Sequence, residues 1–220
     1  MVTIHLSPAS FALPAVPFDV LEKVLSGREW STYSLGLRVR EGVDKVPLLE
    51  LVRRSAARHP LFASKTLSFE LPDVDIQLDA REHQVAFQFF PAVVVGRYTK
   101  LRRDIAQTRH YCYECKGSGR LSGAICPTCN GEQVLTKESV QELLAPFFKD
   151  VFSCDEVLFH GAGREDVDVR MLGNGRPFVL SLENARKKTA DVSALQEKIN
   201  TALEGTVHVS DLHIGTVPDI

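Results

Sequence analysis

The residues best suited to chemistry lie in one stretch, His160–Pro177, which reads HGAGREDVDVRMLGNGRP. Its eighteen residues include four glycines, two aspartates and four arginines or histidines. Glycine has no Cβ, so such a segment can bring its backbone close to a ligand. The alternation in the middle predicts an extended, half-buried strand with one polar face, formed by Arg164, Asp166, Asp168 and Arg170. Arginines beside an aspartate favour the ionised carboxylate, which suits a nucleophile or a metal ligand.

Three interpretations of this polar strip remain open from the residues alone. It could be an edge strand whose charges form surface ion pairs. It could be a two-carboxylate Mg²⁺ site for phosphodiester chemistry, with Asp166 and Asp168 as ligands and Glu183 as a further one. It could also hold a carboxylate nucleophile or base that Arg164 positions.

Four of the five cysteines have the spacing C-x2-C-x10-C-x2-C, at Cys112, Cys115, Cys126 and Cys129. Two such knuckles can present four thiolates tetrahedrally, which predicts a closed, structural Zn²⁺ site. The insert is short, so the metal would supply much of the folding energy of this loop. A metal-free loop and an iron–sulfur centre are the alternatives. Four cysteine ligands would leave no open position for catalysis.

Basic residues are concentrated around the cysteines. Between residues 97 and 120 there are seven lysines or arginines and two acidic residues, although the whole chain has a net charge of −2. A charge run is most often a solvated face. Here three interleaved tyrosines and the cysteine knuckles favour binding to RNA, through phosphate contacts and base stacking. With two arginines of the glycine-rich stretch, the predicted RNA-contacting residues are Arg97, Tyr98, Lys100, Arg102, Arg103, Arg109, Arg170 and Arg176.

Composition is that of an ordinary globular protein. The 220 residues are 44% apolar and 25% charged, which fits one domain or two small ones. No apolar run approaches the roughly 18–20 residues that span a bilayer. The N-terminus lacks the basic start of a signal peptide. We therefore expect a cytoplasmic protein without a membrane partner.

The elements that must position these residues indicate an α+β protein. Hydrophobic periodicity predicts helices at 18–25, 46–58, 136–148 and 191–203, with Thr136 and Asp191 as N-caps. Pro146 could kink the third helix or end it early. Alternation predicts strands at 32–39, 66–71, 74–78, 84–95, 156–159, 177–182 and 206–214, with a bulge or an edge at Pro91. Residues 1–17 are expected to be irregular.

Several blocks of the sequence together resemble a known family. GRYTKLRRDIAQTRHYC, the two CxxC knuckles, ESVQELL and FHGAGREDVDVRMLGNGRPFVL occur in the order seen in archaeal and eukaryotic tRNA pseudouridine synthases that carry a THUMP-related domain. The similarity covers roughly Asp75 to the C-terminus. That family isomerises uridines in the TΨC arm of tRNA and consumes no organic cofactor. The resemblance implies that Asp166, in the G-R-x-D setting, is the catalytic carboxylate. Arg164 would orient it or hold the phosphate of the flipped nucleotide.

The resemblance also implies a division of the chain. Residues 1–95 would form a divergent THUMP-like RNA-binding module and 96–135 a basic segment with a four-cysteine zinc knuckle. Residues 136–220 would form the N-terminal half of the catalytic α/β sheet domain. No tyrosine follows Tyr113, whereas the family stacks one on the target base. We therefore expect a second polypeptide or self-association to complete the active site. The alternatives are a non-catalytic, zinc-containing RNA-binding protein derived from a synthase, and a metal-dependent phosphodiester enzyme.

Overall fold

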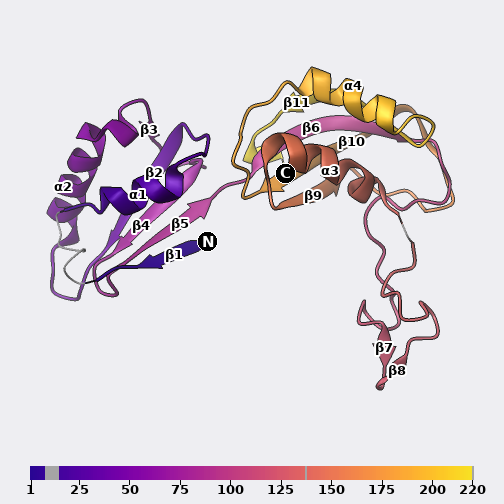
Figure 1. Cartoon of the computed structure of the whole chain (residues 1–220), viewed down its shortest axis with the longest axis horizontal. Helices are drawn as coiled ribbons and strands as arrows, with labels where there is room; N and C mark the ends of the chain where they lie inside the picture. The colour runs from indigo at the N-terminus through magenta and orange to yellow at the C-terminus, as the bar shows by residue number, and fades with distance from the viewer. Residues whose placement is uncertain (8–14, 137, 220) are drawn as a thin grey trace. The chain divides into compact units, whose positions relative to one another are not determined.

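The structure is a computed structural model that describes residues 1–7, 15–136 and 138–219. The chain forms two compact units (Figure 1). The first unit comprises Met1–Pro91 and Arg186–Lys188, and the second comprises Ala92–Ala185 and Thr189–Ile220. None of the helices in the described residues combines the length and apolar character needed to cross a membrane.

The first unit is built on a five-stranded sheet in the order β1-β5-β4-β2-β3. Strand β2 runs parallel to β3 and β4, whereas β5 is antiparallel to β4 and β1. The strands are β1 (Val2–His5), β2 (Thr32–Arg38), β3 (Thr66–Leu67), β4 (Val74–Asp79) and β5 (Gln84–Phe89). The expectation of an irregular N-terminus is therefore wrong for β1. The rest of that lead-in falls partly at 8–14, outside the described residues.

Two α-helices and a short 3₁₀ helix complete the first unit: α1 (Phe18–Leu25), α2 (Lys45–Arg58) and η2 (Pro60–Phe62). The apolar face of α1 buries Leu21 and Leu25, and that of α2 buries Val52 and Ala56. These side chains join the alternate apolar residues of β2, β4 and β5 in one core. The periodicity of the sequence predicted both α-helices to within one residue at each end.

The second unit is built on an antiparallel sheet in the order β11-β6-β10-β9. Its strands are β6 (Ala92–Lys100), β9 (Glu156–Gly161), β10 (Met171–Glu183) and β11 (Val207–Ile214). Helices α3 (Val140–Phe152) and α4 (Val192–Ala202) pack their apolar residues against this sheet (Figure 1). A small hairpin of β7 (Arg120–Leu121) and β8 (Ala124–Ile125) lies between the two pairs of cysteines.

Pro91 explains one difference from the predicted elements, whereas Pro146 does not interrupt its helix. The predicted strand 84–95 is two strands, because Pro91 lies between β5 and β6 and cannot donate to a ladder. These strands belong to different units, so the units divide after Pro91, four residues before the expected boundary. Pro146, in contrast, lies inside α3 without ending it. The buried Leu144, Phe148 and Phe152 hold the helix together across the missing backbone donor.

The N-cap of α3 is Ser139, so the prediction of Thr136 is wrong. The Ser139 hydroxyl accepts a hydrogen bond from the Glu142 backbone N–H at 3.2 Å and donates one to the Glu142 carboxylate at 2.8 Å. This Ser-x-x-Glu pattern satisfies orphan backbone donors at the start of the helix. The predicted cap of α4 is confirmed, since Asp191 accepts from Ala194 N–H at 3.0 Å.

Candidate active site

The glycine-rich stretch forms a loop and not the predicted strand. Strand β9 ends at Gly161 and β10 begins at Met171, and a turn lies between them, with the Val169 N–H donating to the Asp166 carbonyl at 3.3 Å. We call the intervening residues 162–170 the catalytic loop, after the role that the sequence predicts for Asp166 and Arg164. Strict alternation would place Glu165 on the apolar face, and a buried carboxylate cannot be left unpaired there. The loop instead curls so that Glu165 meets polar partners.

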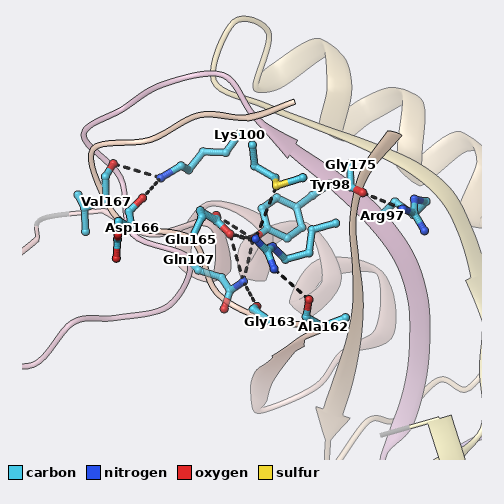
Figure 2. Close-up of polar contacts among 12 residues, drawn as sticks. Arg97, Tyr98, Lys100, Gln107, Ala162, Gly163, Glu165, Asp166, Val167 and Gly175 are labelled. Atoms are coloured by element: carbon cyan, nitrogen blue, oxygen red, sulfur yellow. Dashed lines mark hydrogen bonds and ion pairs between the residues drawn. The ribbon is translucent and has the colours of Figure 1, made fainter. Parts of the chain in front are cut away.

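Glu165 is the buried anion of the catalytic loop, with 8% of its surface exposed. The Tyr98 hydroxyl lies 2.8 Å from both carboxylate oxygens, and Arg176 Nε forms an ion pair at 3.1 Å without hydrogen-bond alignment (Figure 2). Arg176 Nη1 also donates to the Ala162 carbonyl at 3.0 Å. Burial, reinforced by Glu165, raises the pKa of Tyr98 well above its usual value. Tyr98 therefore stays a neutral donor.

Lys100 is the buried cation beneath the same loop. Its Nζ donates to the backbone carbonyls of Ile105 and Asp166 at 2.9 Å and of Val167 at 3.1 Å (Figure 2). An ammonium group has three N–H donors, so all three are used. Burial lowers the pKa of Lys100, and the nearby Glu165 and Asp168 carboxylates oppose that shift. Lys100 thus joins the segment after β6 to the backbone of the catalytic loop.

Gln107 holds the other end of the loop. Its Nε2 donates to the Gly163 carbonyl at 2.8 Å and to the Tyr98 hydroxyl at 2.9 Å. The Gln107 amide needs a glycine at position 161, because a Cβ there would lie only 2.7 Å from Gln107 Nε2. Side chains from β6, β10 and the segment after β6 therefore fix the carbonyls of the catalytic loop. Sequence reasoning missed Glu165 and Gln107, although a carboxylate at an apolar position of a strand pattern was a usable signal.

Asp166 and Arg164, the predicted catalytic residues, are both exposed in this loop. The Asp166 carboxylate has no hydrogen bond or ion pair with any described residue, and Arg164 does not pair with it. The loop thus exposes an unpaired carboxylate on a backbone that Lys100 and Gln107 hold in place.

The predicted RNA-contacting residues divide into buried and exposed groups. Tyr98 and Lys100 are buried, with 1% and 0% of their surface exposed, and their polar groups bond within the protein. Arg97 donates to the carbonyls of Asn174 and Gly175 at 2.7 and 2.8 Å. Together with Arg176, these residues support the catalytic loop and the irregular part of β10 between Met171 and Arg176, where its register against β6 shifts. Their placement differs from the expected surface role.

The remaining predicted RNA contacts lie at the surface. Arg102 pairs with Asp104 and with Glu138, and Arg109 pairs with Glu142. Arg103 and Arg170 are exposed and have no ion-pair partner among the described residues. The basic segment therefore offers fewer free cations than its composition suggests.

The magnesium interpretation finds no support in the geometry. Among the described residues, the four cysteines are the one group of three or more potential ligands that lie close together. Asp166, Asp168 and Glu183 do not form such a group. Glu183 therefore does not join the two aspartates as a third ligand, and the two-carboxylate site stays a hypothesis.

The cysteines form a compact cluster that can bind a metal ion. All four are buried, and their Sγ atoms lie within 4.8 Å of one another. Glycine permits the tight turns, because a Cβ at Gly119 would lie 2.8 Å from the Gly131 carbonyl oxygen. Burial raises the pKa of Cys115, but the Gly119 N–H, 3.3 Å from its Sγ, and the neighbouring thiols outweigh it, so the pKa of Cys115 lies below its usual value. Such a thiol is ready to coordinate a soft metal as a thiolate.

The chain is similar to one family model and to several known proteins. The family model described as "Pus10, C-terminal" matches residues 93–220. The tRNA pseudouridine synthase Pus10 of Halorubrum lacusprofundi is 42% identical over 167 residues, which is 76% of this chain and 39% of the relative. That of Methanothermobacter marburgensis is 38% identical over 185 residues, 83% of this chain and 43% of the relative. That of Methanopyrus kandleri is 39% identical over 153 residues, 68% of this chain and 34% of the relative.

Proposed function

Because the chain belongs to the Pus10 family, we propose that it provides the catalytic aspartate of a tRNA pseudouridine synthase, with Asp166 as the reactive carboxylate. The observation that carries this proposal is the catalytic loop. It exposes an unpaired Asp166, while the buried side chains of Lys100, Glu165 and Tyr98 hold the loop through hydrogen bonds. A group that attacks a substrate reacts faster when its backbone is already held in the required position.

The proposed reaction is an isomerisation of uridine. The glycosidic bond from C1′ to N1 breaks, and the uracil rejoins the ribose through C5. The C5 proton is lost and N1 gains one, so the reaction needs no oxidant or organic cofactor. Asp166 would attack the ribose or the base, or act as a base, once the uridine has left its stack. The exposed Arg164 beside it would hold a phosphate of the flipped nucleotide.

The substrate we propose is tRNA, with the TΨC arm as the target region and a cytoplasmic setting. The relatives are named as tRNA pseudouridine synthases. Arg103 and Arg170 supply free cations for phosphate. The first unit, with its own core, would serve as a THUMP-like RNA-binding module. In it the Arg53 guanidinium lies 4.9 Å from the ring of the exposed Phe69, a combination suited to stacking on a base.

The metal we propose for the four cysteines is a structural Zn²⁺. Their C-x2-C pairs and mutual distances suit tetrahedral thiolate coordination, which Zn²⁺ prefers. The knuckle has little apolar surface of its own, so the ion would stabilise the loop instead of taking part in the reaction.

The chain spans between 34% and 43% of the length of these curated relatives. We propose that further protein completes the cleft around Asp166, whether in one longer polypeptide, in a second copy or in a separate partner chain. Such protein would supply the aromatic residue that stacks on the target base and a cation for the carboxylate.

The decisive experiment measures pseudouridine in tRNA transcripts after incubation with the protein, alone and with extract of its host. Asp166→Asn should lower the rate by about 10²–10⁴-fold or more, since it removes the reacting carboxylate. Asp168→Asn is the matched control, because it removes an exposed aspartate two residues away, and it should keep most of the activity. A wild-type protein that binds tRNA but forms no pseudouridine in either setting would instead identify a non-catalytic RNA-binding protein.

A further inference from the structure

A groove of about 670 Å³ lies in the second unit, outside the catalytic loop. Three elements form its walls: residues 108–111, the exposed side of α3 and strand β9. Its volume falls within the roughly 300–1,000 Å³ typical of sites for small ligands. Neither the reaction at Asp166 nor the cysteine cluster uses this groove.

The wall formed by β9 offers unused backbone groups. Strand β9 is at the edge of its sheet, and Gln141 Nε2 donates to the Val157 carbonyl at 2.9 Å, so the Val157 backbone faces away from β10. Backbone groups of an antiparallel strand alternate in direction, so Phe159 points its N–H and C=O the same way. Among the described strands, none pairs with this edge. The groove therefore receives a donor and an acceptor side by side, as the edge of a nucleobase requires.

The opposite walls contribute an aromatic ring and one cation. Tyr111 lines the groove and is 56% exposed. Its ring lies against Gly117, where a Cβ would approach Tyr111 Cδ1 to 3.0 Å. Arg109 is neutralised by Glu142, whereas Lys149 forms no ion pair with a described residue. One free cation suits one phosphate, and an exposed tyrosine suits a stacked base.

The groove adjoins the machinery of the catalytic loop. Thr108 follows Gln107, which holds the Gly163 carbonyl. At the other side, the Phe159 ring packs against Tyr98 at a centroid distance of 5.5 Å. A nucleotide in the groove would therefore sit beside the supports of Asp166.

We propose that this groove binds one unstacked nucleotide of the RNA substrate, separate from the uridine that reacts. Its base stacks on Tyr111 and pairs with the Phe159 backbone, and its phosphate meets Lys149. The proposal rests on tRNA being the substrate, but not on Asp166 being catalytic. A second bound nucleotide would fix the register of the RNA over the catalytic loop.

Three variants test the groove, each with a matched control in the same unit. Tyr111→Ala removes the stacking ring, and Tyr113→Ala removes a more exposed tyrosine that does not line the groove. Lys149→Ala removes the free cation, and Lys198→Ala removes a lysine that Asp150 pairs at 3.2 Å. Ala145→Phe fills the groove without adding charge, and Ala194→Phe adds the same ring to the exposed face of α4.

Affinity for an unmodified tRNA transcript is measured as a function of salt, after thermal melts have shown that each variant folds. We expect Tyr111→Ala and Ala145→Phe to weaken binding by about 5- to 50-fold, as for the loss of one stacked base. Lys149→Ala should reduce the salt slope by about one. The controls should remain within about twofold of wild type.

Two outcomes would overturn the proposal. In one, the groove variants bind tRNA as well as their controls do. In the other, they leave tRNA affinity unchanged but abolish association with a second copy or another polypeptide, which would make the open edge of β9 a protein interface. The reaction itself is scored separately through Asp166→Asn. If wild-type protein forms no pseudouridine while the groove variants still lose affinity, the proposed reaction fails and the groove site stands.

Discussion

At the scale of single residues, Lys100 contributes three hydrogen bonds to the catalytic loop and the segment before Gln107. Its ammonium joins the carbonyls of Ile105, Asp166 and Val167, and the bond to Ile105 is buried. We expect Lys100→Met to destabilise the protein by about 2–4 kcal/mol, because it removes three hydrogen bonds from a charged donor and leaves the buried Ile105 carbonyl without that partner. Denaturant unfolding measures this, with Lys149→Met as the exposed control. The substitution should also increase the rate of amide hydrogen exchange more in the catalytic loop than in β6. An unchanged midpoint would show that water replaces the ammonium at no cost.

Two adjacent arginines allow a second test at this scale. Arg102 is paired with two carboxylates, whereas its neighbour Arg103 has no ion-pair partner among the described residues. A free cation can neutralise a phosphate without first breaking an ion pair. We expect Arg103→Ala to weaken tRNA binding several-fold and to lower the salt slope by about one. Arg102→Ala should do less. Equal effects would mean that the ion pairs of Arg102 open when RNA binds.

At the scale of elements, the cysteine hairpin should depend on its metal while the sheet of the second unit does not. The hairpin strands β7 and β8 have two residues each, and the thiols form a small core separate from the apolar core of the unit. A chelator or Cys126→Ser should therefore increase proteolysis within 112–131 and leave the far-ultraviolet circular dichroism nearly unchanged. Elemental analysis should find about one zinc per chain. Cys154→Ser, outside the cluster, is the control for metal content.

The end of β4 supplies a pH test for the first unit. Hydrogen bonds from Arg81 lower the pKa of Asp79 to about 2, against the opposing effect of burial. The folded state thus holds the ionised form below the usual pKa of 3.8. The resulting stability is complete above that value and disappears as the pH falls towards 2. Asp79→Asn should remove on the order of 1–2 kcal/mol near neutral pH, allowing for the exposed Arg81, and less at pH 2. Asp19→Asn, on the surface of α1, should show no such pH dependence.

The sequence predicts these elements unevenly, for identifiable reasons. Helices α1, α2 and α4 follow from apolar residues at helical spacing, because one face of each is buried. Strand β1 has only four residues, so its alternation of Val2 and Ile4 with polar residues is too short to predict a strand, and its pairing with β5 defines it. The catalytic loop alternates like a strand, yet the need to pair Glu165 with Tyr98 and Arg176 overrides that pattern. Such long-range polar contacts leave little trace in local periodicity.

At the scale of the whole molecule, the family is recognisable from the sequence because its motifs are long and ordered. The match to the Pus10 C-terminal model begins at residue 93, one residue after the second unit begins. Which side chains support Asp166 was not predictable, since Lys100 and Tyr98 carry the same signature as surface RNA contacts. Their burial depends on the strand register of β6 against β10, which no local pattern specifies.

The isolation of the Asp166 carboxylate has an evolutionary consequence. Its side chain supports nothing among the described residues: the loop is held through backbone carbonyls and through Glu165. A mutation that deletes this carboxylate should therefore leave the free energy of unfolding nearly unchanged, whereas a mutation at Lys100 should lower it. If Asp166 is the reactive carboxylate, as we propose, one substitution would remove the reaction and leave the fold of the second unit intact.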